Sequence, residues 1–280
     1  MDSSDRAPIV TFFSPDALAA DVPAPGVPEA STGVGEGAGS LTTERVITLG
    51  KDAAHHARVR RLQVGVRVRL VDGVGGIGGG TLVRLAKSHL AIEVSEVSRV
   101  DAPPPVHLMV PVADRDRMLW LAEKSTELGV TSWRPVLWRR SRSVSPRGEG
   151  ATFQQRVRAR MVSALEQSGG AWLPVLFPDA KPEHAIAATP AREGGGGGGA
   201  RVLLSPSGSP VLATARTAPV SIALGPEGGF EEDEERALIA AGFEPVSLAG
   251  SVLRFETAGV AALAIVRATL ALTGEDTNAR

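Results

Sequence analysis

Two glycine-bearing segments in the last quarter of the sequence have the residue types of a ligand-binding loop. The first, 225–230, reads Gly-Pro-Glu-Gly-Gly-Phe and follows the apolar run Val220–Leu224. The second, 249–255, contains Gly250 and follows the apolar run Val246–Leu248. Glycine lets a ligand approach the backbone closely. Because the carboxyl ends of parallel strands lie at one edge of a sheet, we expect the two loops to share a pocket.

The acidic run Glu231–Glu235, directly after the first loop, limits which ligand the pocket can take. Consecutive acids at a helix start suit the helix dipole but repel an anion such as phosphate. No Gly-Lys-Ser or Gly-Lys-Thr follows, which excludes a P-loop. S-adenosylmethionine fits this chemistry, because it carries no phosphate and its sulfonium is positive. The same residues also suit an ordinary strand-to-helix turn followed by a well-capped acidic helix.

Polar side chains stand at the end of the second loop, where an Ala-rich helix is predicted. They are Arg254, Glu256 and Thr257. An arginine at such a place can stabilise negative charge that develops on a substrate. Thr257 can cap the first helical turn.

Other motifs lack the context that their chemistry needs. Gly73, Gly75 and Gly78 form a literal G-x-G-x-x-G, but a strand pattern follows it instead of a helix, so we expect a hairpin turn. His55 and His56 have no third ligand at a recognisable spacing, and the chain has no cysteine, so no metal is expected. No G-x-S-x-G supports a serine hydrolase.

Basic residues gather in two segments of a nearly neutral chain. The 280 residues carry 30 Lys and Arg against 31 Asp and Glu, a net charge of −1. Residues 51–69 hold six Lys or Arg with one acid, and residues 134–160 hold eight Arg with one acid. Such segments predict a phosphate-bearing partner if they fold onto one face. The alternative is codon usage, since only four of the basic residues are lysine.

The sequence divides into a small β unit and a larger α/β unit at the stiff run Asp101–Pro105. The first, 1–101, shows period-two alternation, as in Arg67–Val71, with Gly-rich turns and one short helix at 51–62. It is predicted to be a small mixed β-barrel. Small residues dominate 21–44, which indicates a flexible insertion.

The second part, 106–280, alternates strands with helices, which is typical of a mostly parallel α/β sheet. Strands are expected at 106–112, 133–138, 172–177, 202–204, 220–224 and 245–248, and helices at 115–128, 153–167, 231–241 and 256–272. The Gly-rich run at 193–200 is expected to be a loop. No signal peptide is recognised and no uncharged apolar stretch reaches the length of a membrane span, so we expect a cytoplasmic protein without a membrane partner.

Four motifs in order along the second part carry a resemblance to a known family. Leu224–Phe230 and Leu253–Ala258, the latter reading Leu-Arg-Phe-Glu-Thr-Ala, resemble the signature of the bacterial 16S ribosomal RNA (uracil-N3)-methyltransferases of the SPOUT class. Glu123–Val130 and Ala164–Ser168 match two further motifs of that family. Four motifs at the expected separations are far more specific than any one of them.

The N-terminal part adds to the resemblance. Asp52–Val59, together with Asp72 and Gly73, resembles the PUA-like RNA-binding domain of the family. The resemblance implies an α/β protein with a PUA-like β-barrel, followed by a SPOUT domain whose C-terminal segment forms a deep trefoil knot. It also implies that S-adenosylmethionine is the cofactor and that the chain forms a homodimer. The implied reaction is methylation of the N3 of a specific uridine in 16S ribosomal RNA of the small ribosomal subunit.

The resemblance also implies roles for individual residues. Arg254 would stabilise a uracil anion, and Glu256 would orient Arg254 or accept the N3 proton. Glu123 and Glu127 would lie next to the site, or would form an exposed helical face. The residues that would line the cofactor pocket are Leu224, Gly225, Pro226, Glu227, Gly228, Gly229, Leu248, Gly250, Val252, Leu253 and Thr257. The residues that would bind RNA are His56, Arg58, Arg60, Arg61 and Arg142.

Four positions depart from the family pattern, and one of them, Arg60, replaces a usual leucine and makes the helix at 51–62 more basic. Thr11 and Gly170 stand where arginines are usual, and Phe255 stands where threonine is common. They leave two alternatives open. One is a SPOUT methyltransferase that acts on a different RNA base, and the other is an RNA-binding homologue without catalysis.

Overall fold

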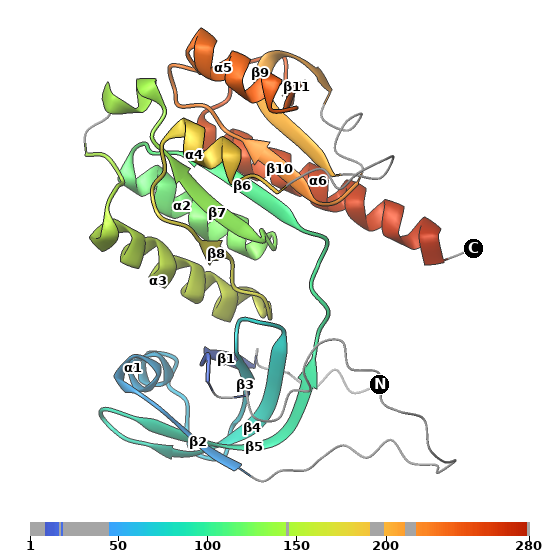
Figure 1. The fold of residues 1–280 in the computed structure, drawn as a ribbon. Helices are drawn as coiled ribbons and strands as arrows, with labels where there is room; N and C mark the ends of the chain where they lie inside the picture. The colour runs from blue at the N-terminus through green and yellow to red at the C-terminus, as the bar shows by residue number, and fades with distance from the viewer. Residues whose placement is uncertain are drawn as a thin grey trace. The chain divides into compact units, whose positions relative to one another are not determined.

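The computed structural model of the chain (Figure 1) describes residues 9–16, 18, 45–143, 146–190, 199–210 and 217–278. These residues form two compact units. The first comprises the described residues up to Asp101 together with Leu165–Trp172, and the second comprises Ala102–Ala164 and the described residues from Leu173 onward. The insertion expected at 21–44 and most of the Gly-rich run expected at 193–200 lie outside the described residues.

A five-stranded sheet forms most of the first unit. Its elements are β1 (Val10–Phe13), β2 (Arg45–Leu49), α1 (Lys51–Val59), β3 (Arg67–Val71), β4 (Gly76–Leu85) and β5 (Leu90–Arg99). The side chains of Val68 and Leu70 alternate with polar neighbours along β3 and pack on Phe12, Leu82 and Ile92. The strand order is β1-β3-β4-β5-β2. Among the described strands, these pairings leave β1 and β2 as the edges of a sheet, whereas the sequence predicts a barrel.

A tight turn before β4 depends on Asp72. Its carboxylate accepts hydrogen bonds from the backbone N–H groups of Val74 and Gly76, both at 2.8 Å. Gly73 and Gly75 have φ angles of 80° and 101°, which favour glycine. Gly78 lies inside β4. The literal glycine motif is therefore a turn and the start of a strand, as its lack of a following helix predicts.

The end of α3 (Ala151–Ser168) belongs to the first unit, although the sequence places it in the second. Glu166 accepts a hydrogen bond from the backbone N–H of Phe13 at 2.9 Å, and its other carboxylate oxygen lies 3.4 Å from Nδ1 of His56. Burial raises the pKa of Glu166 above its ordinary value, against the opposing effect of the Phe13 N–H. Trp172 donates from Nε1 to the carbonyl of Val100 at 3.1 Å. Residues 165–172 thus hold one edge of the first unit.

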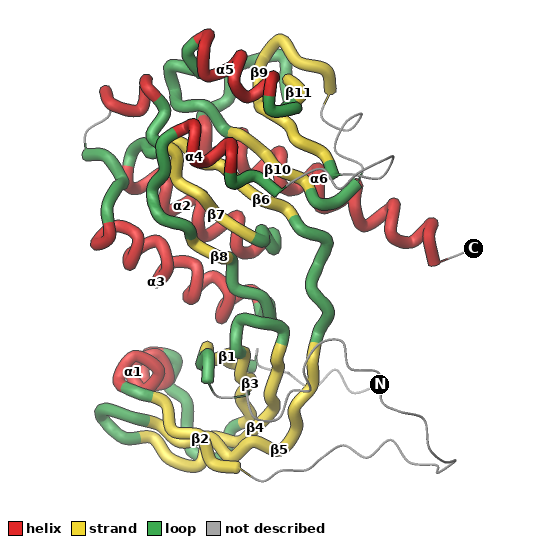
Figure 2. Tube along the Cα trace, in the orientation of Figure 1, coloured by secondary structure: helices red, strands yellow, loops and turns green. Residues whose placement is uncertain are grey.

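The second unit is a six-stranded sheet with helices on both faces (Figure 2). Its strands are β6 (Val106–Pro111), β7 (Ser132–Val136), β8 (Val175–Leu176), β9 (Ala200–Pro210), β10 (Val220–Ala223) and β11 (Glu244–Ser247). The order is β11-β9-β10-β6-β7-β8, and the described pairs are parallel. This confirms the parallel α/β sheet that the alternation of strands and helices predicts.

The helices of this unit are α2 (Arg115–Glu127), most of α3, α4 (Pro182–Ala187), α5 (Glu232–Ala240) and α6 (Phe255–Asn278), with a short 3-10 helix, η1, at Arg139–Ser143. Helices α4 and η1 are not predicted from the sequence, because neither is long enough to show a helical period. Along β6, Leu108 and Val110 face a core shared with α2, α3 and α6. Met109, which lies between them, faces a second core shared with α4 and α5.

Helix α6 joins α2 through Arg267. The segment Phe255–Leu272 of α6 is long and apolar enough to cross a membrane by length and composition alone. No such segment is expected from the sequence, because Arg267 interrupts the apolar run. Arg267 donates to the backbone carbonyls of Leu128 at 3.2 Å, of Gly129 and of Pro104. It therefore satisfies the carbonyls left free at the end of α2.

Replacement of Arg267 by methionine should destabilise the protein. The change leaves partly buried carbonyls without their charged donor, which should lower the free energy of unfolding by about 2 kcal/mol. Urea denaturation checks this, with Arg236→Met on the exposed side of α5 as the control. Equal unfolding midpoints for the two variants would show that Arg267 does not anchor α2.

Candidate functional site

A cavity of about 320 Å³ lies in the second unit where β10 and β11 end and midway along β9. The residues that line it are Leu204, Ser205, Pro206, Leu224, Gly225, Pro226, Glu227, Gly228, Gly229, Phe230, Val246, Leu248, Ala249, Ser251, Val252, Leu253, Phe255 and Ala258. The two glycine-bearing loops therefore meet at one cavity, as expected from the placement of parallel strands.

Most residues expected around the cofactor line this cavity. They are Leu224, Gly225, Pro226, Glu227, Gly228, Gly229, Leu248, Val252 and Leu253. Gly250 and Thr257 are not among its lining residues. Thr257 is exposed and is the third residue of α6, which begins at Phe255, so it does not occupy the capping position that the sequence suggests. The carbonyl of Arg254 accepts the first helical hydrogen bond, from the N–H of Ala258 at 2.8 Å.

A third wall of the cavity, Leu204–Pro206, is not predicted from the sequence. This stretch lies inside β9, which extends well beyond the expected 202–204. It carries no glycine motif, so only the order of the strands could have revealed it: β9 pairs with both β10 and β11. Phe230 and Phe255 also line the cavity; both lie within the quoted motifs but are not among the residues expected around the cofactor.

The first loop is closely packed around Phe230. The N–H of Gly229 donates to the carbonyl of Pro226 at 2.8 Å, and Gly229 has a φ of 76°. The ring of Phe230 packs edge-on against Trp138, with 4.9 Å between centroids. A Cβ at Gly225 would lie 3.2 Å from the Phe230 ring, so a side chain there would make a tight contact with the ring.

Arginines of η1 hold the first loop and α5 from one side. Arg140 donates from Nε to Glu231 at 2.9 Å and from Nη1 to the carbonyl of Gly228. Arg139 pairs with Asp233, and this hydrogen bond lowers the pKa of Asp233 below its ordinary value. Two arginines of the basic segment 134–160 are therefore engaged with the acidic run, instead of being free for a phosphate-bearing partner.

Arg254 and Glu256 have different surroundings. Arg254 is exposed at the start of α6. The side chain of Glu256 is only 12% exposed, and its Oε1 lies 3.9 Å from Nε of Arg117 in α2. Arg117 also forms an ion pair with Glu227 of the first loop. The sequence gives no signal for Arg117, because it lies in a mixed-charge helix start with no motif of its own.

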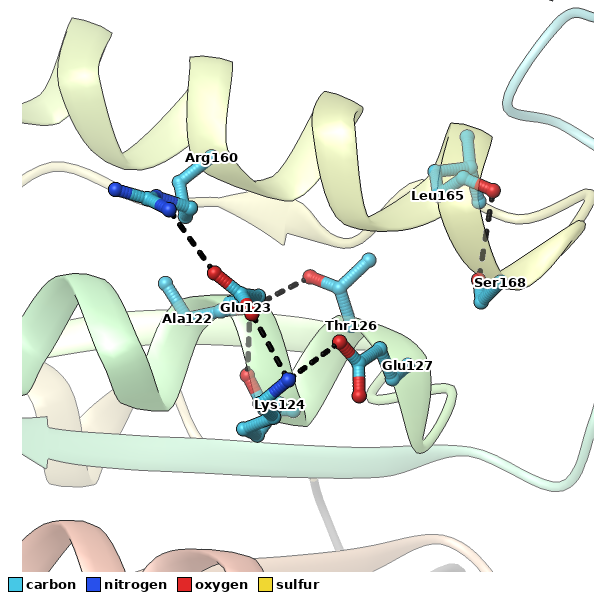
Figure 3. Close-up of polar contacts among 9 residues, drawn as sticks. Ala122, Glu123, Lys124, Thr126, Glu127, Arg160, Leu165 and Ser168 are labelled. Carbon is cyan, nitrogen blue, oxygen red and sulfur yellow. Dashed lines mark hydrogen bonds and ion pairs between the residues drawn. The ribbon is translucent and has the colours of Figure 1, made fainter. Parts of the chain in front are cut away.

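Glu123 and Glu127 lie in a surface ion cluster on α2 (Figure 3). The ammonium of Lys124 is 2.8 Å from a carboxylate oxygen of each, and Arg160 of α3 is 3.0 Å from Glu123. The hydrogen bond from Lys124 lowers the pKa of Glu123. Of the two interpretations offered by the sequence, this arrangement favours the exposed helical face.

The residues expected to bind RNA lie in both units. Arg58, Arg60 and Arg61 are exposed at the end of α1, and Arg58 donates to the carbonyl of Lys87 at 2.8 Å. His56 is half-buried against Glu166 and the ring of Phe12. The backbone of Arg142 lies in η1, but its side chain is outside the described residues.

No group of three or more His, Asp or Glu side chains with the spacing of a metal site occurs in the described part of the chain.

Two family models match the sequence. An RNA methyltransferase domain matches residues 101–267, and an RNA methyltransferase PUA domain matches residues 49–95. The ribosomal RNA small subunit methyltransferase E of Synechocystis sp. is 31% identical over 233 residues, covering 81% of this chain and 74% of the relative. The protein of the same name from Mycobacterium bovis is 30% identical over 231 residues, covering 78% of this chain and 84% of the relative.

Solved structures share the fold. The crystal structure of a ribosomal RNA small subunit methyltransferase E from Neisseria gonorrhoeae, bound to S-adenosyl methionine, matches with a TM-score of 0.75 and 24% identity. It covers 93% of this chain and 97% of its own. A Legionella pneumophila protein in complex with the same cofactor matches with a TM-score of 0.73 and 22% identity, over 94% of this chain and 98% of its own.

Glu234 should be the residue on which the anchorage of η1 to α5 depends. It is 6% exposed and accepts hydrogen bonds from the backbone N–H groups of Arg139 at 2.8 Å and Glu231 at 3.0 Å. Glu234→Gln turns an amide NH₂ toward one of these donors, which should lower the free energy of unfolding by about 1–2 kcal/mol. Glu232→Gln, at an exposed neighbour, is the control in urea denaturation. A Glu234→Gln variant as stable as the control would contradict this role.

Proposed function

This chain belongs to the family of RNA methyltransferases that includes the ribosomal RNA small subunit methyltransferases E, and we propose that it methylates the N3 of one uridine in 16S ribosomal RNA. The observation that carries the proposal is the cavity built by the two motif loops, 224–230 and 248–253. It lies within the part of the chain that matches the RNA methyltransferase domain.

The cavity suits S-adenosylmethionine. Its volume of about 320 Å³ and its apolar walls are typical of a cofactor site. No basic side chain is among its described lining residues, and its one ionisable side chain, Glu227, is paired with Arg117, so the cavity offers a phosphate no partner of opposite charge. When bound, the cofactor supplies an electrophilic methyl group. The backbone groups of Gly225–Gly229 and the side chains of Leu248 and Leu253 would hold it.

Arg254 is the residue proposed to act on the RNA base. The N3 of uracil carries a proton at neutral pH, and its removal leaves negative charge shared between N3 and the two carbonyl oxygens beside it. The exposed Arg254, which follows the cavity residue Leu253, would stabilise that charge. The carboxylate of Glu256 is largely buried beside Arg117, which favours a positioning role over direct acceptance of the proton.

The first unit is proposed to bind the RNA backbone. It contains the match to the PUA domain, and α1 ends in the exposed residues Arg58, Arg60 and Arg61. Clustered arginines bind phosphates in a sequence-independent way and so position a nucleic acid. The partner would be the small ribosomal subunit or its RNA, in the cytoplasm.

A homodimer and a C-terminal trefoil knot complete the proposal. Helix α6 exposes a stripe of Ala264, Ala268 and Ala271 with Leu272, and Trp120 of the neighbouring α2 is 44% exposed. Such an apolar face supports burial against a second copy. The knot rests on the resemblance of the motifs Leu224–Phe230 and Leu253–Ala258 to those of the family.

Arg254→Ala should abolish methylation while cofactor affinity stays within about threefold of the wild type, because Arg254 acts on the base and does not line the cavity. Small ribosomal subunits from a strain without this gene would be incubated with each protein and S-adenosylmethionine, and their nucleosides analysed by mass spectrometry. Arg236→Ala serves as the control.

Full activity of Arg254→Ala would remove Arg254 from the mechanism. A methylated base other than N3-methyluridine would indicate a different target, and no methylation by the wild type would indicate a non-catalytic RNA-binding protein.

Joint replacement of Arg58, Arg60 and Arg61 by glutamine should weaken RNA binding and flatten its dependence on salt. Each lost phosphate contact reduces the slope of log affinity against log salt by about one. Binding to a 16S RNA fragment would be titrated at several salt concentrations. The triple replacement of the exposed Arg236 and the acid-paired Arg139 and Arg160 is a charge-matched control. A slope equal to that of the wild type would exclude the end of α1 from the RNA interface.

A further inference from the structure

Arg117 bridges the two loops of the cavity. Its guanidinium forms an ion pair with Glu227 in the wall of the cavity, and its Nε lies 3.9 Å from Glu256 in the first turn of α6. Glu227 follows β10 and Glu256 follows β11, so the two acids belong to different segments of the chain. A single side chain from α2 therefore contacts both segments that shape the cofactor site.

The burial of Glu256 makes this contact necessary. Its side chain is 12% exposed, and its Oε2 is buried without a hydrogen-bond partner among the described residues. A carboxylate in such a place is stable only with a compensating positive charge nearby. The nearby charge on α2 is the guanidinium of Arg117, which is itself 31% exposed.

Arg117 is held on a rigid base. Asp114 caps α2 by accepting hydrogen bonds from the backbone N–H groups of Asp116 and Arg117, both at 3.1 Å. One turn further, α2 meets α6 closely, since a Cβ at Gly259 would lie 2.9 Å from a methyl group of Leu121 and 3.0 Å from one of Leu224. The start of α2, the start of α6 and the end of β10 therefore pack as one block, and Arg117 projects from it toward both acids.

We propose that Arg117 is a positioning residue of the methyl-transfer site, which fixes Glu227 relative to Glu256 and thereby sets the affinity of the cavity for S-adenosylmethionine. The inference rests on the proposed function for the identity of the cofactor. It adds a residue outside the two loops and outside the cavity lining, and it gives Glu256 the role of an anchor for the start of α6.

Calorimetric binding of S-adenosylmethionine in the absence of RNA tests the proposal. Arg117→Met should raise Kd about tenfold, whereas Arg117→Lys should recover part of the affinity, because an ammonium can pair with one carboxylate but cannot bridge both. The double variant Arg117→Met/Glu227→Gln should have a Kd within about twofold of that of Arg117→Met alone, since the two changes remove the same interaction.

Arg160→Met provides a matched control, because it breaks another arginine–glutamate pair between α2 and a neighbouring helix, away from the cavity. It should leave Kd unchanged. Thermal unfolding of each variant separates positioning from stability. A lower unfolding temperature for Arg117→Met together with a wild-type Kd would overturn the proposal. Strictly additive effects of Arg117→Met and Glu227→Gln on the binding free energy would also overturn it. Failure of the wild-type protein to bind S-adenosylmethionine would instead refute the proposed function itself.

Discussion

The conformation of the loop Gly225–Gly229 is the constraint on which the rest of the site depends. Its small residues leave the backbone accessible to a ligand, but they supply few side-chain contacts of their own to fix its shape. The contacts come from outside the loop: Arg140 of η1 holds the carbonyl of Gly228, and Arg117 of α2 pairs with Glu227. The parallel sheet brings these elements to one edge, and arginine–carboxylate pairs then fix the loop between them.

This arrangement explains why acidic residues surround a site in a protein that acts on RNA. Glu231 and Asp233 each pair with an arginine of η1, so the acidic run neutralises part of the basic segment. The clustered charges therefore have mainly an internal structural role in the second unit. The arginines that remain exposed without a described carboxylate partner, such as those at the end of α1, are better placed to contact phosphate.

The sequence predicts the parts of the molecule that have a local signal. The parallel sheet follows from the alternation of strands and helices, and the shared cavity follows from the glycines after β10 and β11. The wall at Leu204–Pro206 and the bridge at Arg117 cannot be read in this way, because both depend on which elements become neighbours in the folded chain. The same reason explains why residues 165–172, which the sequence assigns to the second part, group with the first unit: the continuous helical period of α3 gives no sign that Glu166 accepts a hydrogen bond from Phe13.

The anchor of α6 at Arg267 differs chemically from the anchors of the cavity. Its three acceptors are backbone carbonyls, which do not titrate, whereas Arg117, Arg139 and Arg140 depend on ionised carboxylates. Of these acids, Asp233 has its pKa lowered by the hydrogen bond from Arg139. That pair therefore stabilises the fold above the pKa of the unfolded acid, and its contribution is lost as the pH falls through the lower pKa of the folded state. Acid should weaken this contact between η1 and α5, whereas the carbonyl acceptors of Arg267 at the joint between α2 and α6 are unaffected by the same change in pH.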